Sequence, residues 1–229
     1  MDFGFSEEQD MLRQAAHDFL QEHCPITFVR QMMEDDRGYS AEMWKSMADL
    51  GWLGLAFPEN HGGQGLGFVD LTVILEEMGA ALLPSPFLST VLLAGQAILL
   101  GGSEAQKQAY LPKIANGSLL ATLALTEPSG RFDAEGVADV KATPAGDGFA
   151  ISGTKLFVPD AHIADLMVVA ARTKESGDKS FGISLFLVDA AAPGVTVTLL
   201  KTMDQTRKLT EVVLKDVQVG ADRVLALRS

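Results

Sequence analysis

The amino-acid sequence predicts an α+β fold, with an N-terminal all-α domain over residues 1–118 and a small antiparallel β-domain over residues 119–229. Apolar residues recur at helical spacing in the first half. In the second half the apolar runs are short, rich in Val, Ile, Thr and Phe, and separated by turn signals. With 229 residues and 47% hydrophobic content, the chain can bury two cores of ordinary size.

Capping boxes mark the beginnings of two expected helices. Ser6 is followed three residues later by Gln9, and Ser103 is followed three residues later by Gln106. Within each pair, the side chain of one residue can accept a hydrogen bond from the backbone N–H of the other. The first of these helices should end before Pro25, because proline cannot continue a helix.

Further helices are expected between these two. One begins near Ser40 and ends at Gly51, a residue suited to a left-handed cap, and another follows the glycine-rich loop 59–65. The uncharged stretch 78–102 is interrupted by two prolines. The helix that remains, about 87–100, is too short to cross about 30 Å of hydrocarbon, so a buried core helix rather than a membrane span is expected.

Seven short strands are expected in the second half, separated by turns at 145–148 and 192–194. This number of short strands is typical of a sandwich or barrel-like domain. The expected strands are Leu119–Thr126, Phe149–Ser152, Leu156–Val158, Leu166–Ala171, Ile183–Val188, Val195–Leu200 and Glu211–Val217.

Charge and cysteine content narrow the classes of protein. A net charge of −12 argues against binding to nucleic acid, because the field of the chain would repel a polyanion. The single cysteine, Cys24, cannot form an internal disulfide, and the N-terminus lacks a basic region before an apolar run. A cytoplasmic protein is therefore expected, with Cys24 as a small buried residue.

Common catalytic and metal-binding motifs are missing from the sequence. It contains no P-loop, no Rossmann glycine fingerprint, no zinc-ligand spacing and no Gly-x-Ser-x-Gly elbow. Its four histidines, His17, His23, His61 and His162, are scattered, so metal binding is not expected.

The most informative segment is Leu123-Ala-Leu-Thr-Glu-Pro128, a strand that runs into a turn ending in proline. It resembles the middle-domain signature of the acyl-CoA dehydrogenase family. The resemblance covers essentially the whole chain, because other segments match in the expected order. They are Phe5–Gln9, Gly51–Glu59 followed by Gly62, Gly63 and Gly65, Gly153–Lys155, and Asp204–Arg207.

The resemblance implies an FAD enzyme that desaturates the Cα–Cβ bond of an acyl-CoA thioester. A carboxylate base takes the α-proton, the β-hydrogen passes as hydride to the flavin, and hydrogen bonds stabilise the developing enolate. The electrons would pass to an electron-transfer flavoprotein. Family membership further implies a homo- or hetero-oligomer, either a dimer or a tetramer.

Five cofactor-site residues follow from the resemblance. Leu123, Leu125 and Thr126 match residues whose backbone and hydroxyl meet the flavin ring. Phe157 stands where the family usually has a tryptophan that stacks on the flavin; its alternative role is packing within the strand. Pro159 replaces a threonine or serine that bonds the flavin, and it offers neither a hydroxyl nor an N–H.

Three residues are expected on the substrate side. Phe132 replaces a serine that would reach the acyl-CoA, and Arg131 is either a compensating phosphate ligand or a solvated surface residue. Arg207 is either a substrate contact or one partner of an interdomain ion pair.

The resemblance places the catalytic glutamate on a C-terminal helical bundle, and this sequence stops at Ser229, where that bundle would begin. No catalytic residue can therefore be named, and the chain alone is expected to be inactive. It is either a fragment of a longer polypeptide or a naturally short subunit. Functionally, the alternatives are a flavin-dependent dehydrogenase, a flavin-poor, non-catalytic partner subunit of a hetero-oligomer, and an acyl-CoA oxidase.

Overall fold

The computed structural model describes residues 4–175, 177–178 and 180–227, and the chain forms two compact units. The chain passes from the first unit to the second after Ser85, after Ser118 and after Arg207. The first unit contains Met1–Ser85, Leu111–Ser118 and Asp204–Arg207, and the second contains Pro86–Tyr110, Leu119–Met203 and Lys208–Ser229.

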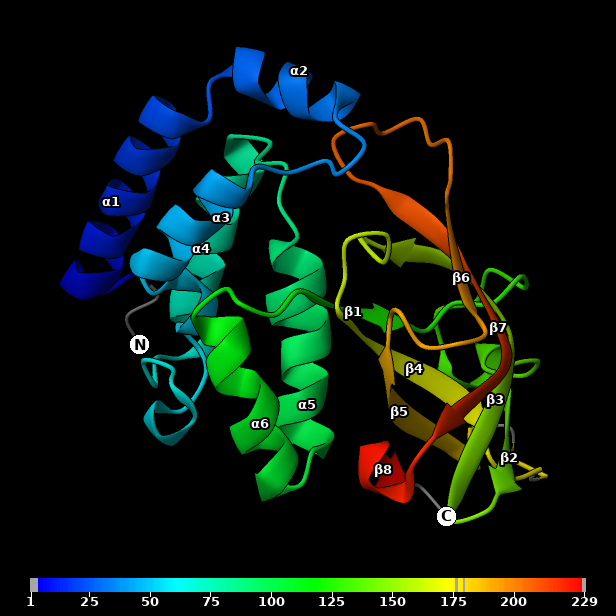
Figure 1. Cartoon of the computed structure of the whole chain (residues 1–229). Helices are drawn as coiled ribbons and strands as arrows, with labels where there is room; N and C mark the ends of the chain where they lie inside the picture. The colour runs from blue at the N-terminus through cyan, green and yellow to red at the C-terminus, as the bar shows by residue number, and fades with distance from the viewer. Residues whose placement is uncertain (1–3, 176, 179, 228–229) are drawn as a thin grey trace. The chain divides into compact units, whose positions relative to one another are not determined.

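The first unit is helical (Figure 1). Its elements are α1 (Glu7–His23), α2 (Ile26–Glu34), η1 (Trp52–Gly54), η2 (Glu59–His61), α3 (Ala41–Asp49), α4 (Phe68–Ala80) and the end of α6 (Glu104–Ala115). The predicted capping box of α1 is present, because the Gln9 N–H donates to Ser6 Oγ over 3.2 Å and the Ser6 N–H donates to Gln9 Oε1 over 3.0 Å. Helix α2 was not predicted. Pro25 ends the preceding helix as expected, but it is also the N-cap residue of α2.

Helix α1 packs on α4 to form the core of this unit. Ala16 and Leu20 of α1 are buried, as are Leu71 and Ile74 of α4. The glycine-rich loop before α4 folds tightly, since a Cβ atom at Gly63 would lie 2.0 Å from a backbone oxygen. Glycine is therefore required at that position for the chain to approach itself so closely.

The part of the uncharged stretch that begins at Pro86 forms helices in the second unit. It comprises η3 (Leu88–Gly95), which is a π-helix, and α5 (Gln96–Gly101), and it is followed by the beginning of α6. The predicted capping box of α6 is present between Ser103 and Gln106. None of the helices in the described part of the chain has the length and apolar character of a membrane span.

The second unit also contains a mostly antiparallel sheet, in agreement with the predicted fold class. Seven of its strands follow the order β6-β7-β3-β2-β4-β5-β8, and β1 pairs with β4. The pairings of β4 with β1 and with β2 are parallel. The strands are β1 (Ala121–Ala124), β2 (Lys141–Ala145), β3 (Gly148–Pro159), β4 (Leu166–Arg172), β5 (Ile183–Asp189), β6 (Val195–Leu199), β7 (Leu209–Val219) and β8 (Val224–Leu227).

The strand predictions need two corrections. Strands β2 and β8 were not predicted, and the expected strands 149–152 and 156–158 are parts of the single strand β3. Two register shifts against β7 interrupt the alternation of apolar residues in β3, one next to Gly153 and one between Lys155 and Val158. Such bulges hide the continuity of a strand from a pattern of period two.

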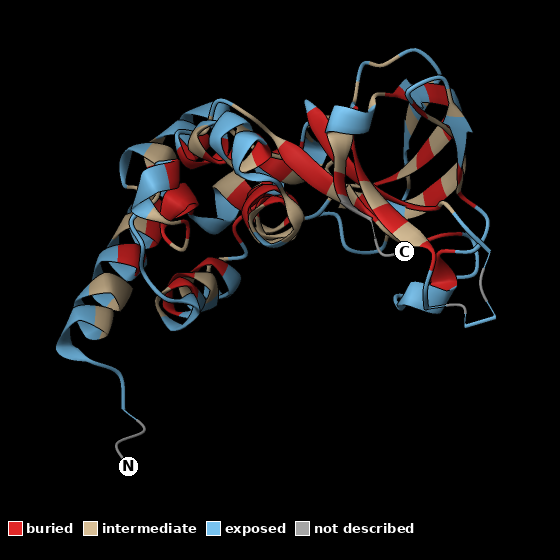
Figure 2. Ribbon diagram, turned by 90° about the horizontal axis from the view of Figure 1, so that it is seen from below, coloured by how far each residue is buried: buried red, intermediate tan, exposed pale blue. Residues whose placement is uncertain are grey.

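The sheet encloses the second apolar core (Figure 2). All seven residues of β4 are buried, as expected for a strand paired on both sides. On β1, Ala121, Thr122 and Ala124 are buried, whereas Leu123 is only half-buried. Ala124 packs into the sheet core, and because side chains alternate along a strand, Leu123 lies on the opposite face.

Candidate flavin-binding site

The end of β1 combines two half-buried leucines with a hydroxyl group. Leu123 and Leu125 are both half-buried, and the spacing of two places them on one face of the extended segment. Thr126 follows and is only 5% exposed. Among the residues that the structure describes, no protein group hydrogen-bonds to the Thr126 hydroxyl. The strand end thus presents apolar edges and one hydroxyl that is available to a ligand.

A buried ion pair lies directly behind this strand end. Lys155 Nζ donates to Glu127 Oε1 over 2.8 Å and to the Leu125 carbonyl oxygen over 2.9 Å. The two charged side chains are 0% and 1% exposed. Because both charges are removed from water, the pair depends on complete hydrogen bonding for its stability.

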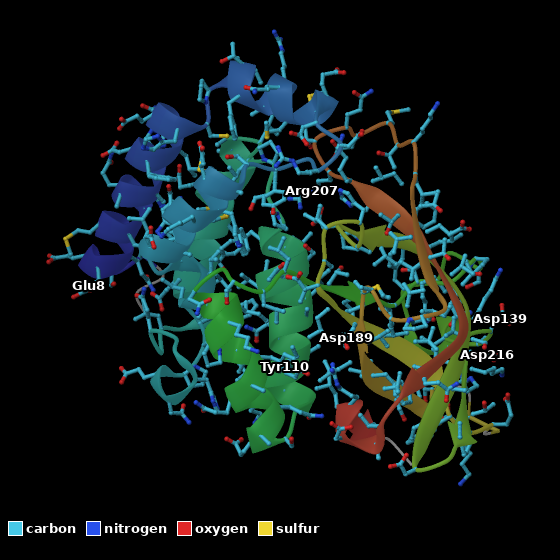
Figure 3. The ribbon with its side chains drawn as sticks, viewed as in Figure 1. Glu8, Tyr110, Asp139, Asp189, Arg207 and Asp216 are labelled. Carbon is cyan, nitrogen blue, oxygen red and sulfur yellow. The ribbon has the colours of Figure 1, made fainter. Side chains whose placement is uncertain are left out.

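The Glu127 carboxylate also accepts three backbone N–H groups from the loop that leads into β2. The donors are Ala138 at 2.9 Å, Asp139 at 2.6 Å and Val140 at 3.2 Å. Figure 3 labels Asp139 in this loop. Glu127 therefore joins the end of β1 to residues 138–140.

The charges of this pair are set by burial and hydrogen bonding. Desolvation lowers the pKa of Lys155 from 10.5 to about 8, although its hydrogen bond to Glu127 acts in the opposite direction. Burial by itself would raise the pKa of Glu127. Hydrogen bonds from Lys155 and from the Asp139 N–H outweigh that effect, so that the pKa of Glu127 lies below its ordinary value.

Phe157 occupies the β-bulge of β3. Its φ of 55° lies in the left-handed region, which is uncommon for a bulky residue, and its side chain is 47% exposed. The preceding Leu156 N–H donates to the Thr126 carbonyl oxygen over 2.9 Å. The bulge thus turns an aromatic ring outward from a strand that is hydrogen-bonded to the end of β1.

The segment after Phe157 is held by three elements. Thr122 of β1 donates to the Pro159 carbonyl oxygen over 2.6 Å, and Thr210 of β7 donates to the Val158 carbonyl oxygen over 2.8 Å. Ser89 of η3 donates to Asp160 Oδ2 over 2.6 Å. Pro159, which is half-buried, therefore has its carbonyl oxygen bonded within the protein and has no N–H to offer.

The turn after Pro128 carries Arg131 and Phe132. Phe132 is 75% exposed. The Arg131 guanidinium pairs with Asp133 over 2.6 Å and with Glu135 over 2.9 Å. The hydrogen bond to Asp133 raises the pKa of Arg131, with a smaller contribution from the charge of Glu135. A phosphate ligand would have to compete with two carboxylates for this guanidinium.

Arg207, labelled in Figure 3, lies in the Asp204–Arg207 segment. This segment belongs to the first unit. The side chain of Arg207 is exposed. The pKa of Asp204 is lowered first by a hydrogen bond from the Thr206 hydroxyl and, to a smaller extent, by the charge of Arg207. Both roles expected for Arg207, a substrate contact and an ion-pair partner, stay predictions.

The structure thus brings together two of the segments that were predicted to form the site. Leu123 comes from β1, and Leu125 and Thr126 come from the segment directly after it. Phe157 lies in the β3 bulge, and Pro159 is the last residue of β3. Within the described part of the chain, no group of three His, Cys, Asp or Glu side chains is arranged to hold a metal ion.

The ion pair that supports these segments was not predicted from the sequence. Glu127 and Lys155 both stand in segments recognised by resemblance, but neither was identified as a site residue. The available signal was the single charged residue in each of two motif segments, Leu123–Pro128 and Gly153–Lys155. Buried lysine and glutamate are rare unless they are paired, so two such positions indicate a possible ion pair.

The comparisons with known proteins agree with this architecture. Residues 6–118 match the family description "Acyl-CoA dehydrogenase, N-terminal domain", and residues 122–217 match "Acyl-CoA dehydrogenase, middle domain". Mitochondrial isovaleryl-CoA dehydrogenase of Pongo abelii is 32% identical over 235 residues, which cover 97% of this chain and 53% of that protein.

Solved structures are similar over the whole chain. The acyl-CoA dehydrogenase of Geobacillus kaustophilus has a TM-score of 0.88 at 28% identity, covering 100% of this chain and 60% of that one. The ChsE4-ChsE5 complex of Mycobacterium tuberculosis gives a TM-score of 0.86 at 29% identity, covering 98% of this chain and 58% of that one. The chain therefore spans between half and two thirds of the length of these relatives. It belongs to the acyl-CoA dehydrogenase family, of which it contains the N-terminal helical domain and the middle β-domain.

Proposed function

We propose that the chain supplies one wall of the flavin site of an FAD-dependent acyl-CoA dehydrogenase. The observation that carries the proposal is the junction of the β1 end with the β3 bulge. There the Thr126 hydroxyl, which has no hydrogen-bond partner within the described part of the chain, and the outward-turned ring of Phe157 come from two segments that are hydrogen-bonded to each other.

The residues at this junction fit a flavin ring. The Thr126 hydroxyl would donate to a polar edge of the isoalloxazine, and Leu123 and Leu125 would contact its apolar part. Phe157 would stack on the ring face, with an aromatic area smaller than that of the tryptophan usual in the family. When bound, FAD supplies the hydride acceptor for α,β-desaturation of an acyl-CoA thioester.

The remaining parts of the mechanism belong to the whole protein. The base that removes the α-proton would come from residues outside this chain, so the chain alone is expected to be inactive. In this proposal acyl-CoA is the substrate, an electron-transfer flavoprotein accepts the electrons, and the cytoplasm is the compartment. Phe132 and Arg207 are proposed to lie on the substrate side.

The test is the visible spectrum of the whole protein, purified alone and then incubated with FAD. Flavin absorbance that stays with the protein through gel filtration is expected, together with bleaching when an acyl-CoA substrate is added without an electron acceptor. Peroxide release during turnover would identify an oxidase instead. A preparation that stays colourless after incubation with FAD would contradict the proposal.

A second candidate is a flavin-poor, non-catalytic subunit of a hetero-oligomeric acyl-CoA dehydrogenase. Two observations support it. Pro159 offers no hydrogen-bond donor to a flavin, and the Arg131 guanidinium is paired with two acidic side chains. Among the similar structures, ChsE4-ChsE5 is a complex of two different chains. If this candidate is correct, the whole protein stays colourless alone and co-purifies with a second, flavin-containing chain.

A further inference from the structure

We infer that Lys155 is a positioning residue for the proposed flavin site and that its buried ammonium group aims the Thr126 backbone and hydroxyl at the cofactor. The inference rests on the proposed function, because it gives a role to a residue that would not itself touch FAD. Its evidence is the set of contacts between Lys155, the end of β1 and the β3 bulge.

Lys155 joins the two segments of the proposed site. It stands at one edge of the bulge that contains Phe157, and its Nζ atom reaches the Leu125 carbonyl oxygen over 2.9 Å. The next residue of β3 donates its N–H to the Thr126 carbonyl oxygen over 2.9 Å. The strand end and the bulge are therefore connected at two successive peptide groups.

The bond to the Leu125 carbonyl fixes the orientation of a whole peptide group. A trans peptide is planar, so its carbonyl oxygen and its N–H point in opposite directions. Holding the Leu125 oxygen toward Lys155 therefore turns the Thr126 N–H away from Lys155. It also restricts the Cα position from which the Thr126 side chain projects. An apolar residue at position 155 could fill the same volume but could not set this direction.

Glu127 extends the effect of Lys155 to a second segment. The same Oε1 atom that accepts from Lys155 also accepts the Val140 N–H, and Oε2 accepts the N–H groups of Ala138 and Asp139. On the far side of this loop, the buried Arg172 donates to the Val137 carbonyl oxygen from Nε over 3.0 Å and from Nη2 over 2.7 Å. The loop is thus held between two charged groups, and the Lys155 end of this network adjoins the proposed site.

The decisive variant is Lys155→Met in the whole protein, which keeps the volume and removes the donor. FAD binding is expected to weaken by about tenfold or more, the consequence of misdirecting one good hydrogen bond. The absorption bands of the bound flavin should also shift, because the polar contact at Thr126 changes. Loss of stability alone would not shift those bands.

The matched control is Ile151→Ala, which removes a fully buried side chain from the same strand without touching the site. Both variants should unfold more easily than the wild type, but only Lys155→Met should change the spectrum of bound flavin. If Lys155→Met does not fold, Lys155→Gln, which keeps an N–H donor on a shorter side chain, takes its place and should give a smaller change of the same kind.

A double-mutant cycle with Thr126→Val tests the connection directly. If Lys155 acts by aiming Thr126, removal of the hydroxyl should weaken FAD binding strongly in the wild type and only slightly in Lys155→Met. Additive effects, or equal losses of FAD affinity in Lys155→Met and Ile151→Ala, would overturn the inference and leave a purely structural lysine. A wild type that never binds FAD would instead refute the proposed function.

Discussion

At the scale of single residues, the buried carboxylate of Glu127 joins separate segments of the second unit. Its carboxylate accepts one ammonium and three backbone N–H groups while its side chain is 1% exposed. Replacing Glu127 by alanine leaves the buried ammonium group of Lys155 and three backbone N–H groups without their acceptor. We expect Glu127→Ala to lower the free energy of unfolding of the second unit by about 3–5 kcal/mol, as measured by urea unfolding.

Replacing both partners of the pair provides the control. Buried ion pairs can often be exchanged for apolar residues without loss of stability. Here, however, the double variant Glu127→Leu with Lys155→Met would still leave the N–H groups of residues 138–140 without their acceptor, so its stability should recover only in part. Complete recovery would mean that these three hydrogen bonds contribute little.

The same carboxylate predicts a dependence of stability on pH. The pKa of Glu127 is lower in the folded protein than its ordinary value of 4.5. A carboxyl group whose pKa is lower in the folded than in the unfolded protein stabilises the fold fully at any pH above its pKa in the unfolded chain. This stabilisation is lost as the pH falls through its pKa in the folded protein. The thermal unfolding temperature should therefore fall below about pH 4.5 more steeply in the wild type than in Glu127→Gln. Parallel curves for the two proteins would contradict this assignment.

At the scale of elements, the β3 bulge stores backbone strain at the proposed site. Left-handed backbone costs a bulky residue roughly 1 kcal/mol or more relative to glycine, yet Phe157 adopts it with φ of 55°. We expect Phe157→Gly to stabilise the flavin-free protein by about 1 kcal/mol in urea unfolding while weakening FAD binding. Phe157→Ala keeps the strain and loses the ring, so it should weaken binding without the gain in stability.

The elements also show which parts of the fold can be predicted from the sequence and which cannot. Both capping boxes were predicted because their signals lie within four residues of each other. The continuity of β3 was not predicted, because the bulges at Gly153 and Phe157 interrupt the alternation of its apolar residues. These bulges depend on pairing with β7, which lies more than fifty residues away in the sequence. Local signals thus located most elements, whereas register and bulges depend on long-range pairing.

The same distinction applies to the candidate site. The resemblance indicated Leu123, Leu125, Thr126, Phe157 and Pro159 as a set, without showing what holds them in place. The pair Glu127–Lys155 joins residues 28 positions apart, and nothing in the local pattern of either segment specifies its partner. Likewise, only the structure shows that Arg131 is paired with acidic neighbours from its own turn.

At the scale of the whole molecule, the net charge of the chain repels the anionic ligands that the proposed function requires. FAD and acyl-CoA are both anionic, and the chain carries −12. Within the described residues, the proposed site offers a hydroxyl, an aromatic ring and leucine edges, while its nearest arginine in sequence, Arg131, is paired with two carboxylates. The isolated 229-residue chain should therefore lose added FAD on gel filtration, and stoichiometric yellow cofactor on it would contradict this expectation.

Repulsion between the acidic chain and anionic FAD should depend on salt, because salt screens the repulsion between like charges. At about 0.01 M salt the Debye length is roughly 30 Å, and at 0.1 M it is roughly 10 Å, so the field of the chain reaches an approaching anion less well at the higher concentration. Weak FAD binding to the isolated chain, followed by flavin fluorescence, should accordingly strengthen as salt is raised over this range. Riboflavin is the matched control, because it carries the same ring without the phosphates and should bind independently of salt. FAD binding that instead weakens as salt is raised would mean that the attraction of a local cationic group exceeds the repulsion by the net charge. The first residue to replace would then be Arg131, which would have to be released from Asp133 and Glu135 to bind the phosphates.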